Sequence, residues 1–275
     1  MKIDAHQHFW HYSTEEYGWI DDGMRAIRRD FLPTDLEATL RPVGVTGVVS
    51  VQARQTLEET RWLLALAEKH SIIKGVVGWL PLASPSVAEA LDEFSACPVF
   101  KGVRHVVQGE PDPAFLGRAL FNAGLREVTA RGLVYDLLIL ARQLPTAVAF
   151  VDRHPKQVFV LDHIAKPVVQ GSPDPAWVWN INNLARRENV YCKFSGVITE
   201  VPGWQWTPER LRPYFDVVMD AFGPKRLMFG SDWPVCLVAS DYARWFGFVE
   251  QCTSGLSNGE RDRLLGGTAA EAYKL

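Results

Sequence analysis

Eight short segments rich in β-branched and apolar residues recur along the chain and constrain its fold more than any other feature. Several are nearly continuous apolar runs, as expected for strands that are buried on both faces of a parallel sheet. The segments span residues 2–6, 45–52, 72–79, 100–107, 132–139, 158–164, 190–197 and 226–232.

Stretches with helical periodicity separate many of these strands. They cover residues 57–70, 87–94, 115–130, 144–153 and 208–222. A strand-and-helix alternation repeated eight times predicts an α/β protein, a single closed (β/α)8 TIM barrel over residues 1–275. An open, doubly wound sheet is the structural rival. It is disfavoured because no G-x-G-x-x-G motif follows the first strand and because eight units favour closure.

The composition narrows the class of partner. Of the 275 residues, 47% are hydrophobic and 22% are charged, and the formal net charge is −3. No clustered basic surface is available for nucleic acid or an anionic membrane, so we expect a small-molecule partner. The chain shows neither a secretory signal nor an apolar run of about eighteen residues. Its four cysteines form no C-x-x-C pair, which favours free thiols and a cytoplasmic location.

Polar side chains gather where the predicted strands end. His6 and His8 alternate along the first strand and therefore point to the same side. Asp232 ends the eighth strand, which is the neighbour of the first in a closed barrel, and His163 ends the sixth. Catalysis in TIM barrels takes place at this end of the strands, so we interpret the four residues as a catalytic cluster. Asp4 lies deeper, where a supporting role and a functional role are both open.

These motifs are similar to those of a known protein family. D-x-H-x-H on the first strand, L-D-H on the sixth and G-S-D-W-P on the eighth resemble the amidohydrolase superfamily. The segments VQAR, KGVRH, LDHIAKP, KFSG and RLMFGSDWPVC are similar to its sugar-lactonase branch, which includes L-fuconolactonases and L-rhamnonolactonases. The resemblance implies a carboxylic ester hydrolase that opens a sugar-acid lactone to the aldonic acid.

The sequence departs from the two-metal pattern of that superfamily. Arg104 and His105 stand on the fourth strand where a bridging lysine carboxylate or glutamate is expected. Tyr135 and Asp136 stand on the fifth where a histidine ligand is expected. The resemblance therefore allows at most one divalent ion, with nitrogen and oxygen ligands that suit Zn²⁺, and a metal-independent enzyme stays open. The candidate ligands are His6, His8, His163 and Asp232.

Lactone hydrolysis needs a base for water, a stabiliser for the oxyanion and a proton for the ring oxygen. Asp232 is the predicted base, because a carboxylate among imidazoles stays ionised. Without a metal, protonated His6, His8 or His163 would stabilise the oxyanion together with Arg104 or Lys193. Lys193 could instead pair with a carboxylate behind the site.

A pocket for a polyhydroxylated lactone needs many hydrogen-bonding groups and some aromatic walls. The predicted substrate contacts are Gln52, Arg54, Arg104, His105, Tyr135, Lys193 and Trp233. Asp136 and Ser195 also lie near strand ends. The long connection 9–40 and the tryptophan-rich stretch 201–206 are expected to form the rim, with Trp10, Trp19 and Trp204.

Two other functions are alternatives to lactone hydrolysis. The first is a hydrolase or decarboxylase of the same fold that acts on a pyrone or an aromatic carboxylic acid. It would require several arginines at the strand ends, where only Arg54 and Arg104 are evident. The second is an inactive barrel that binds sugar or serves as a scaffold. Such a protein is expected to lack one of the four central residues, and all four are present.

Overall fold

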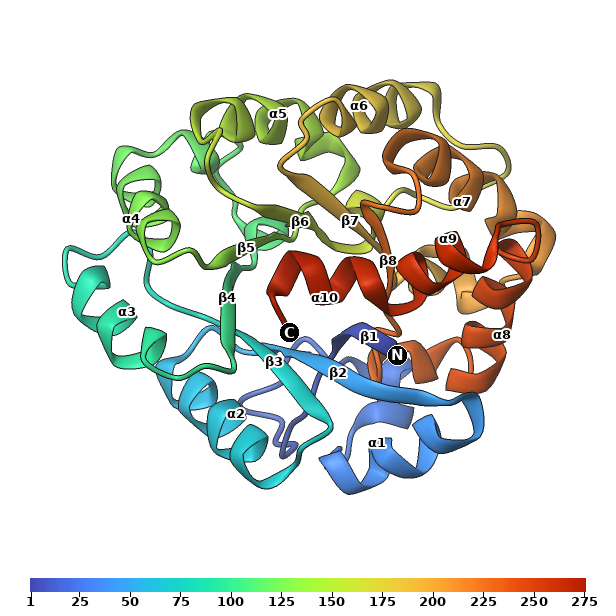
Figure 1. The fold of residues 1–275 in the computed structure, drawn as a ribbon, viewed down its shortest axis with the longest axis horizontal. Helices are drawn as coiled ribbons and strands as arrows, with labels where there is room; N and C mark the ends of the chain where they lie inside the picture. The colour runs from blue at the N-terminus through green and yellow to red at the C-terminus, as the bar shows by residue number, and fades with distance from the viewer.

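Eight parallel strands form one continuous sheet in the computed structural model, which describes residues 1–275. Each strand pairs with the next one in the sequence, from β1 to β8 (Figure 1). The strands are β1 Lys2–Gln7, β2 Val45–Val51, β3 Ile73–Gly78, β4 Phe100–His105, β5 Val134–Leu137, β6 Phe159–Leu161, β7 Val190–Phe194 and β8 Leu227–Phe229. Each one falls at a predicted segment, so the predicted strands are confirmed.

The segment that follows β8 closes the ring against β1. The backbone N–H of Asp232 donates to the carbonyl of His6 at 2.8 Å, and the N–H of His8 donates to the carbonyl of Trp233 at 2.7 Å. The TIM-barrel prediction is thereby confirmed. The backbone that completes the barrel also carries three of the four predicted catalytic side chains.

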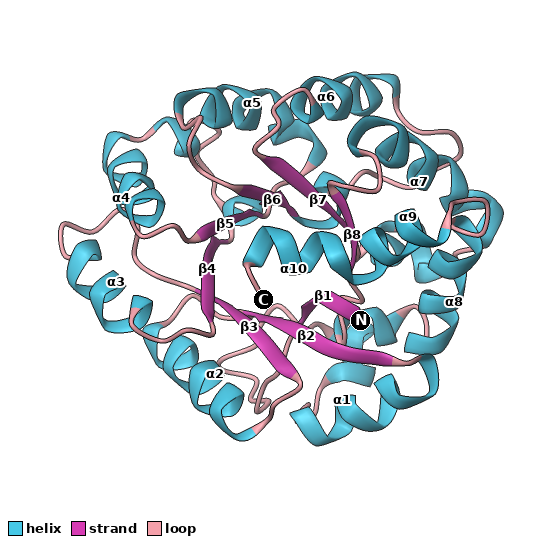
Figure 2. Cartoon of the chain, in the orientation of Figure 1, coloured by secondary structure: helices cyan, strands magenta, loops and turns pink.

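Helices α1 to α8 surround the strands as an outer ring, and α9 and α10 follow them (Figure 2). The helices are α1 Pro33–Leu40, α2 Leu57–Lys69, α3 Val87–Ser95, α4 Ala119–Ala130, α5 Leu144–Arg153, α6 Pro175–Ala185, α7 Pro208–Phe222, α8 Tyr242–Cys252, α9 Asn258–Asp262 and α10 Thr268–Tyr273. Helices α2, α3, α4, α5 and α7 fall at the predicted stretches, whereas α1, α6, α8, α9 and α10 were not among them. Helix α6 buries Trp177, Ile181 and Leu184 at helical spacing, but three asparagines weaken its sequence signal. None of the helices is long and apolar enough to span a membrane.

Two apolar clusters make up the core. The larger one lies between the barrel and the helices. The smaller one fills the inside of the barrel, where Val49, Val77 and Val160 meet Ala269 and Tyr273 of α10. Figure 1 shows α10 lying across the middle of the ring. Because α10 packs over the amino ends of the strands, a site can open only at their carboxyl ends.

Candidate active site

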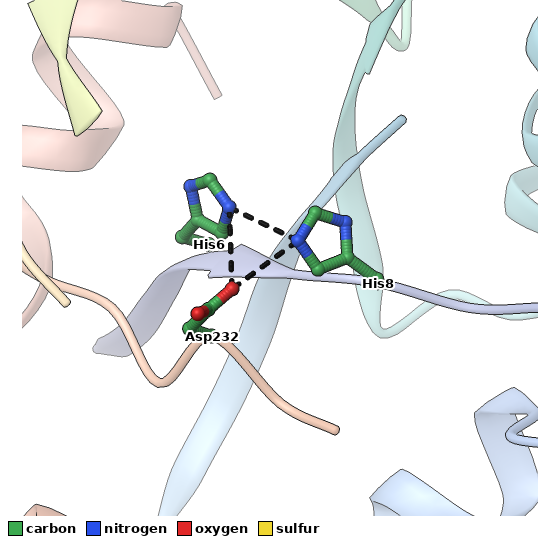
Figure 3. A group of neighbouring side chains, drawn as sticks. All are labelled: His6, His8 and Asp232. Carbon is green, nitrogen blue, oxygen red and sulfur yellow. Dashed lines mark hydrogen bonds and ion pairs between the residues drawn. The ribbon is translucent and has the colours of Figure 1, made fainter. Parts of the chain in front are cut away.

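The four side chains predicted to be catalytic converge at the carboxyl ends of the strands. His6 and His8 face each other, with 3.2 Å between their Nε2 atoms. Oδ1 of Asp232 lies 3.2 Å from Nε2 of His8 and 3.7 Å from Nε2 of His6 (Figure 3). Nε2 of His163 is 3.9 Å from the same oxygen. Three imidazoles thus surround one carboxylate oxygen.

A left-handed turn after β6 brings His163 to this point. Four consecutive residues have positive φ: His163 (52°), Ile164 (49°), Ala165 (61°) and Lys166 (47°). For residues with a side chain, this conformation costs about 1–2 kcal/mol each. The indole N–H of Trp177 donates to the carbonyl of Ile164 at 2.9 Å and helps to hold the turn. Strain of this kind is typical of functional sites.

Gly196 provides the space in which His163 and Asp232 meet. Its φ is +63°, and a Cβ at this position would lie 2.5 Å from Nδ1 of His163 and 3.1 Å from Oδ2 of Asp232. Any larger residue would therefore displace one of the two side chains. Next to Gly196, the hydroxyl of Ser195 lies 2.8 Å from Nδ1 of His163 and orients the ring.

The hydrogen bonds of His6 and His8 determine which nitrogens face the site. Nδ1 of His8 lies 2.8 Å from the carbonyl of Val51, which can only accept, so Nδ1 carries the proton. Nδ1 of His6 lies 3.2 Å from Oδ1 of Asp162, which can only accept, and 3.2 Å from the ammonium of Lys193, which can only donate. His8 therefore presents the lone pair of Nε2 to the site. The guanidinium of Arg104 reaches Nε2 of His6 at 3.3 Å.

This donor set fits a divalent cation. Nε2 of His6, Nε2 of His8 and a carboxylate oxygen of Asp232 lie close enough together to ligate one ion, and all three residues are buried. The two Nε2 atoms are 3.2 Å apart, which leaves room for one proton or one cation between them. A metal site is therefore possible here, with two imidazole nitrogens and one carboxylate oxygen as the central ligands.

Burial and charge set the protonation of the cluster. Burial lowers the pKa of His163 to about 4 and holds the pKa of His6 well below its ordinary value. Burial alone would raise the pKa of Asp232, but the imidazoles outweigh it and hold that pKa below its ordinary value. At neutral pH, Asp232 is an anion beside neutral His6 and His163. These two rings are therefore poorly suited to stabilise an oxyanion as cations, contrary to our expectation.

A layer of buried charges supports the site from inside the barrel. The ammonium of Lys193 donates to Asp136, lies 3.1 Å from Oδ1 of Asp162 and lies 3.2 Å from Nδ1 of His6. Arg104 donates to Oδ2 of Asp162 at 3.0 Å. Lys193, Asp136 and Asp162 have no exposed side-chain surface, so this layer positions His6 and does not face the cavity. Asp162 was not singled out from the sequence, although it adjoins His163 directly after the buried strand β6.

Asp4 has a supporting role. Its Oδ1 accepts from the backbone N–H of Ser231 at 2.8 Å and of His6 at 3.1 Å. Its Oδ2 accepts from the hydroxyl of Tyr242 at 3.0 Å. Asp4 thus ties β1 to the segment after β8 and carries no group into the cavity.

A cavity of about 810 Å³ opens above the cluster. Five of the predicted site residues line it: His8, Arg54, Arg104, His163 and Asp232. Two of the expected rim tryptophans, Trp19 and Trp204, line the cavity wall, whereas Trp10 is fully buried and packs against Phe31. His6 lies behind the lining, fully buried. Sequence reasoning missed several polar residues of the lining, which are Glu16, Gln55, Thr56, Gln108, Lys166, Thr199 and Glu200.

Five predicted substrate contacts lie outside the lining. Lys193 belongs to the layer below the site. Gln52 is buried beside the backbone of Arg104, to which its side-chain amide donates at 3.4 Å. The other three, His105, Tyr135 and Trp233, face the surrounding helices and loops.

The alternation of side chains along β4 and β5 explains the positions of His105 and Tyr135, whereas Trp233 lies in the segment after β8. The ring of His105 stacks on Phe115, and its Nε2 lies 2.6 Å from the carboxylate of Glu110. Tyr135 is fully buried among aromatic rings between the barrel and its helices, and its hydroxyl has no partner. Its neighbour Asp136 points into the barrel instead. The ring of Trp233 packs against Phe31.

Comparison with known proteins gives one consistent result. The family model described as amidohydrolase matches residues 3–275. An L-fucono-1,5-lactonase of Burkholderia multivorans is 41% identical over 286 residues, covering 100% of this chain and 96% of that protein. An L-fucono-1,5-lactonase of Burkholderia ambifaria is 37% identical and covers the same shares. The crystal structure of an amidohydrolase from Burkholderia multivorans with bound zinc has a TM-score of 0.97 at 40% identity, covering 100% of this chain and 99% of that one.

Proposed function

Because the chain belongs to the amidohydrolase family, we propose that it is a lactonase that opens a sugar-acid lactone to the aldonic acid, with Asp232 activating water. One observation carries the proposal for the site: an ionised carboxylate, ringed by imidazoles, lies at the floor of a cavity large enough for a monosaccharide. The lactonases that the chain resembles over its full length supply the substrate class, an aldonolactone such as L-fucono-1,5-lactone.

The reaction follows from the residues in the cavity. Asp232 accepts a proton from water, and the water oxygen attacks the lactone carbonyl. Negative charge develops on the carbonyl oxygen, and Arg104 is the fixed cation that lines the cavity beside His6. When the bond to the ring oxygen breaks, Asp232 returns its proton to the leaving alkoxide. The product is one open-chain hydroxy acid.

His6, His8, His163 and Asp232 are the residues that would hold a divalent ion, and Zn²⁺ suits their nitrogen and oxygen donors. When bound, such an ion would polarise the carbonyl and lower the pKa of water. Asp162 and the carbonyl of Val51 orient His6 and His8 for this purpose.

The charges in the cavity favour an uncharged substrate. Each cation of the lining already has a carboxylate partner. Arg54 pairs with Glu16 at 2.6 Å, Arg104 with Asp162 at 3.0 Å, and Lys166 with Glu200 at 3.6 Å. A pyrone dicarboxylate or an aromatic acid would require unpaired cations. A neutral sugar lactone is therefore the better fit, and the alternative substrates are disfavoured.

A pH-indicator assay on a panel of six-carbon and 6-deoxy aldonolactones tests the proposal. We expect rapid hydrolysis of at least one member, including L-fucono- or L-rhamnonolactone. Metal analysis before and after chelator treatment tests the ion, with about one ion per chain and loss of activity on its removal as the expected result. Turnover of pyrone dicarboxylate with no turnover of any sugar lactone would overturn the proposed substrate class.

A further inference from the structure

Two ion pairs stand on opposite sides of the cavity. Arg54 follows β2 and pairs with Glu16, whereas Lys166 follows β6 and pairs with Glu200. Strands β2 and β6 are separated by half of the eight-stranded ring, so the two pairs face each other across the catalytic cluster. All four residues line the cavity. A substrate held over Asp232 therefore lies between them.

The two pairs differ in how closely they are joined. Nη1 of Arg54 and Oε1 of Glu16 are 2.6 Å apart, which is a closed hydrogen bond. Nζ of Lys166 and Oε1 of Glu200 are 3.6 Å apart, which exceeds hydrogen-bond distance. Neither side chain of this second pair makes another hydrogen bond. Lys166 and Glu200 thus form an open pair, with unused hydrogen-bonding capacity beside the catalytic cluster.

The surrounding backbone holds this pair in place. Lys166 ends the left-handed turn that carries His163, and Glu200 lies in the loop after β7. The N–H of Val169 donates to the carbonyl of Glu200 at 3.3 Å, which joins the two loops. Both side chains are mostly buried, with 20% and 23% of their surfaces exposed. The backbone and the burial of the two side chains therefore fix the gap between Lys166 and Glu200 in the cavity wall.

We propose that Lys166 and Glu200 form a hydroxyl-binding subsite, in which one free hydroxyl of the substrate accepts from Lys166 and donates to Glu200. An oxygen about 2.8 Å from each polar atom spans the gap. Only a group that is both donor and acceptor satisfies both side chains, and a hydroxyl is such a group. A carboxylate would be repelled by Glu200, and a methylene would leave both charges without a bridge. This inference rests on the proposed function and specifies that the lactone carries a hydroxyl beside the reacting ring atoms.

Two lactones of the same ring size distinguish a role in binding a hydroxyl from a general role in catalysis. L-fucono-1,5-lactone carries hydroxyls, and δ-valerolactone has none. A hydrogen bond to a charged group contributes about 1.5–3 kcal/mol, so Lys166→Met and Glu200→Gln should each lower kcat/KM for the fuconolactone roughly 10- to 100-fold. For δ-valerolactone we expect a change within about twofold. The matched control is Glu250→Gln, which breaks the Lys2–Glu250 pair outside the cavity and should alter neither value.

The outcomes are distinct. Equal losses on both lactones in either variant, or no loss on the fuconolactone, would overturn the subsite. Failure of the wild-type protein to open any lactone would overturn the proposed function instead. In that case, the change in intrinsic tryptophan fluorescence on binding of L-fucose still tests the subsite, because Trp19 and Trp204 line the cavity. Binding that both variants weaken supports it, and absent or unchanged binding refutes it.

Discussion

The Nε2 atoms of His6 and His8 point at each other across 3.2 Å, and His8 has its proton fixed on the far nitrogen. This arrangement places two imidazole nitrogens beside the anionic carboxylate of Asp232. Negative charge is thus concentrated at the cavity floor, where a cation or a polarised water would be held.

Replacing Asp232 by asparagine removes the proposed base and keeps its shape. We expect kcat/KM for the best aldonolactone to fall at least about 10²- to 10⁴-fold, because general-base catalysis contributes this much. Circular dichroism should show an unchanged fold. The surface variant Asp216→Asn is the control and should keep full activity. Near-normal turnover by a folded Asp232→Asn protein would exclude the carboxylate as the base.

Replacing Lys193 by methionine should destabilise the protein severely. The change leaves Asp136 and Asp162 buried without their common partner, and the loss of one member of a buried charged group costs roughly 3–5 kcal/mol. The free energy of unfolding from urea titration measures the effect. Lys2→Met is the control: it breaks a partly exposed pair and should cost about 1 kcal/mol or less. A similar loss in both variants would contradict the supporting role of Lys193.

Replacing Gly196 by alanine should impair catalysis more than stability. The new Cβ would lie 2.5 Å from Nδ1 of His163, and displacement of a catalytic group by about 1 Å can cost roughly 10²-fold in rate. Gly44 has a similar φ of +71° and nothing within 4 Å, so Gly44→Ala isolates the backbone cost of about 1–2 kcal/mol. We expect both variants to lose stability and only Gly196→Ala to lose activity. Full activity in Gly196→Ala would show that the site tolerates the shift.

Glu59 makes the stability of the fold depend on pH. Its Oε2 accepts from the N–H of Ala53 and of Arg54, while its Oε1 is buried without a partner. Burial raises the pKa of Glu59 from 4.5 to about 7. Ionisation thus favours the unfolded chain, and the cost is absent below pH 4.5 and grows until the pH passes about 7.

The variant Glu59→Gln isolates this cost. Relative to wild type, it should gain about 3 kcal/mol of unfolding free energy between pH 4.5 and pH 8, because each pKa unit corresponds to about 1.4 kcal/mol. Urea titrations of both proteins at the two pH values measure the change. The exposed variant Glu93→Gln should show little such pH dependence. A pH-independent difference for Glu59→Gln would mean that Glu59 has an ordinary pKa.

The sequence predicted the strands and the catalytic cluster because both depend on simple geometry. Apolar runs identify strands that are covered on both faces, and barrel closure places Asp232 next to His6 and His8. Individual strand faces were harder to predict. Tyr135 and Asp136 are adjacent and must point to opposite faces, and the four-residue strand β5 gives no pattern that selects between them.

The cavity walls were less predictable still. Glu16, Lys166 and Glu200 come from irregular connections, where neither helical nor strand periodicity applies. The position of Lys166 depends on a left-handed turn that contains no glycine and hence leaves no sequence signal. Lys193 was predicted both as a substrate contact and as a partner for a carboxylate behind the site, and it occupies the second position.

The hydroxyl of Tyr273 on α10 donates to Asp136 at 2.7 Å, and Asp136 holds the lysine that contacts His6. The histidine lies on β1 and the tyrosine on α10, so the ribosome synthesises the two ends of this chain of contacts far apart in time. During translation, the inside of the barrel therefore lacks its polar anchor until Tyr273 has been made. Contacts so distant in sequence slow folding, so the buried layer that supports His6 is completed only after α10 has been synthesised.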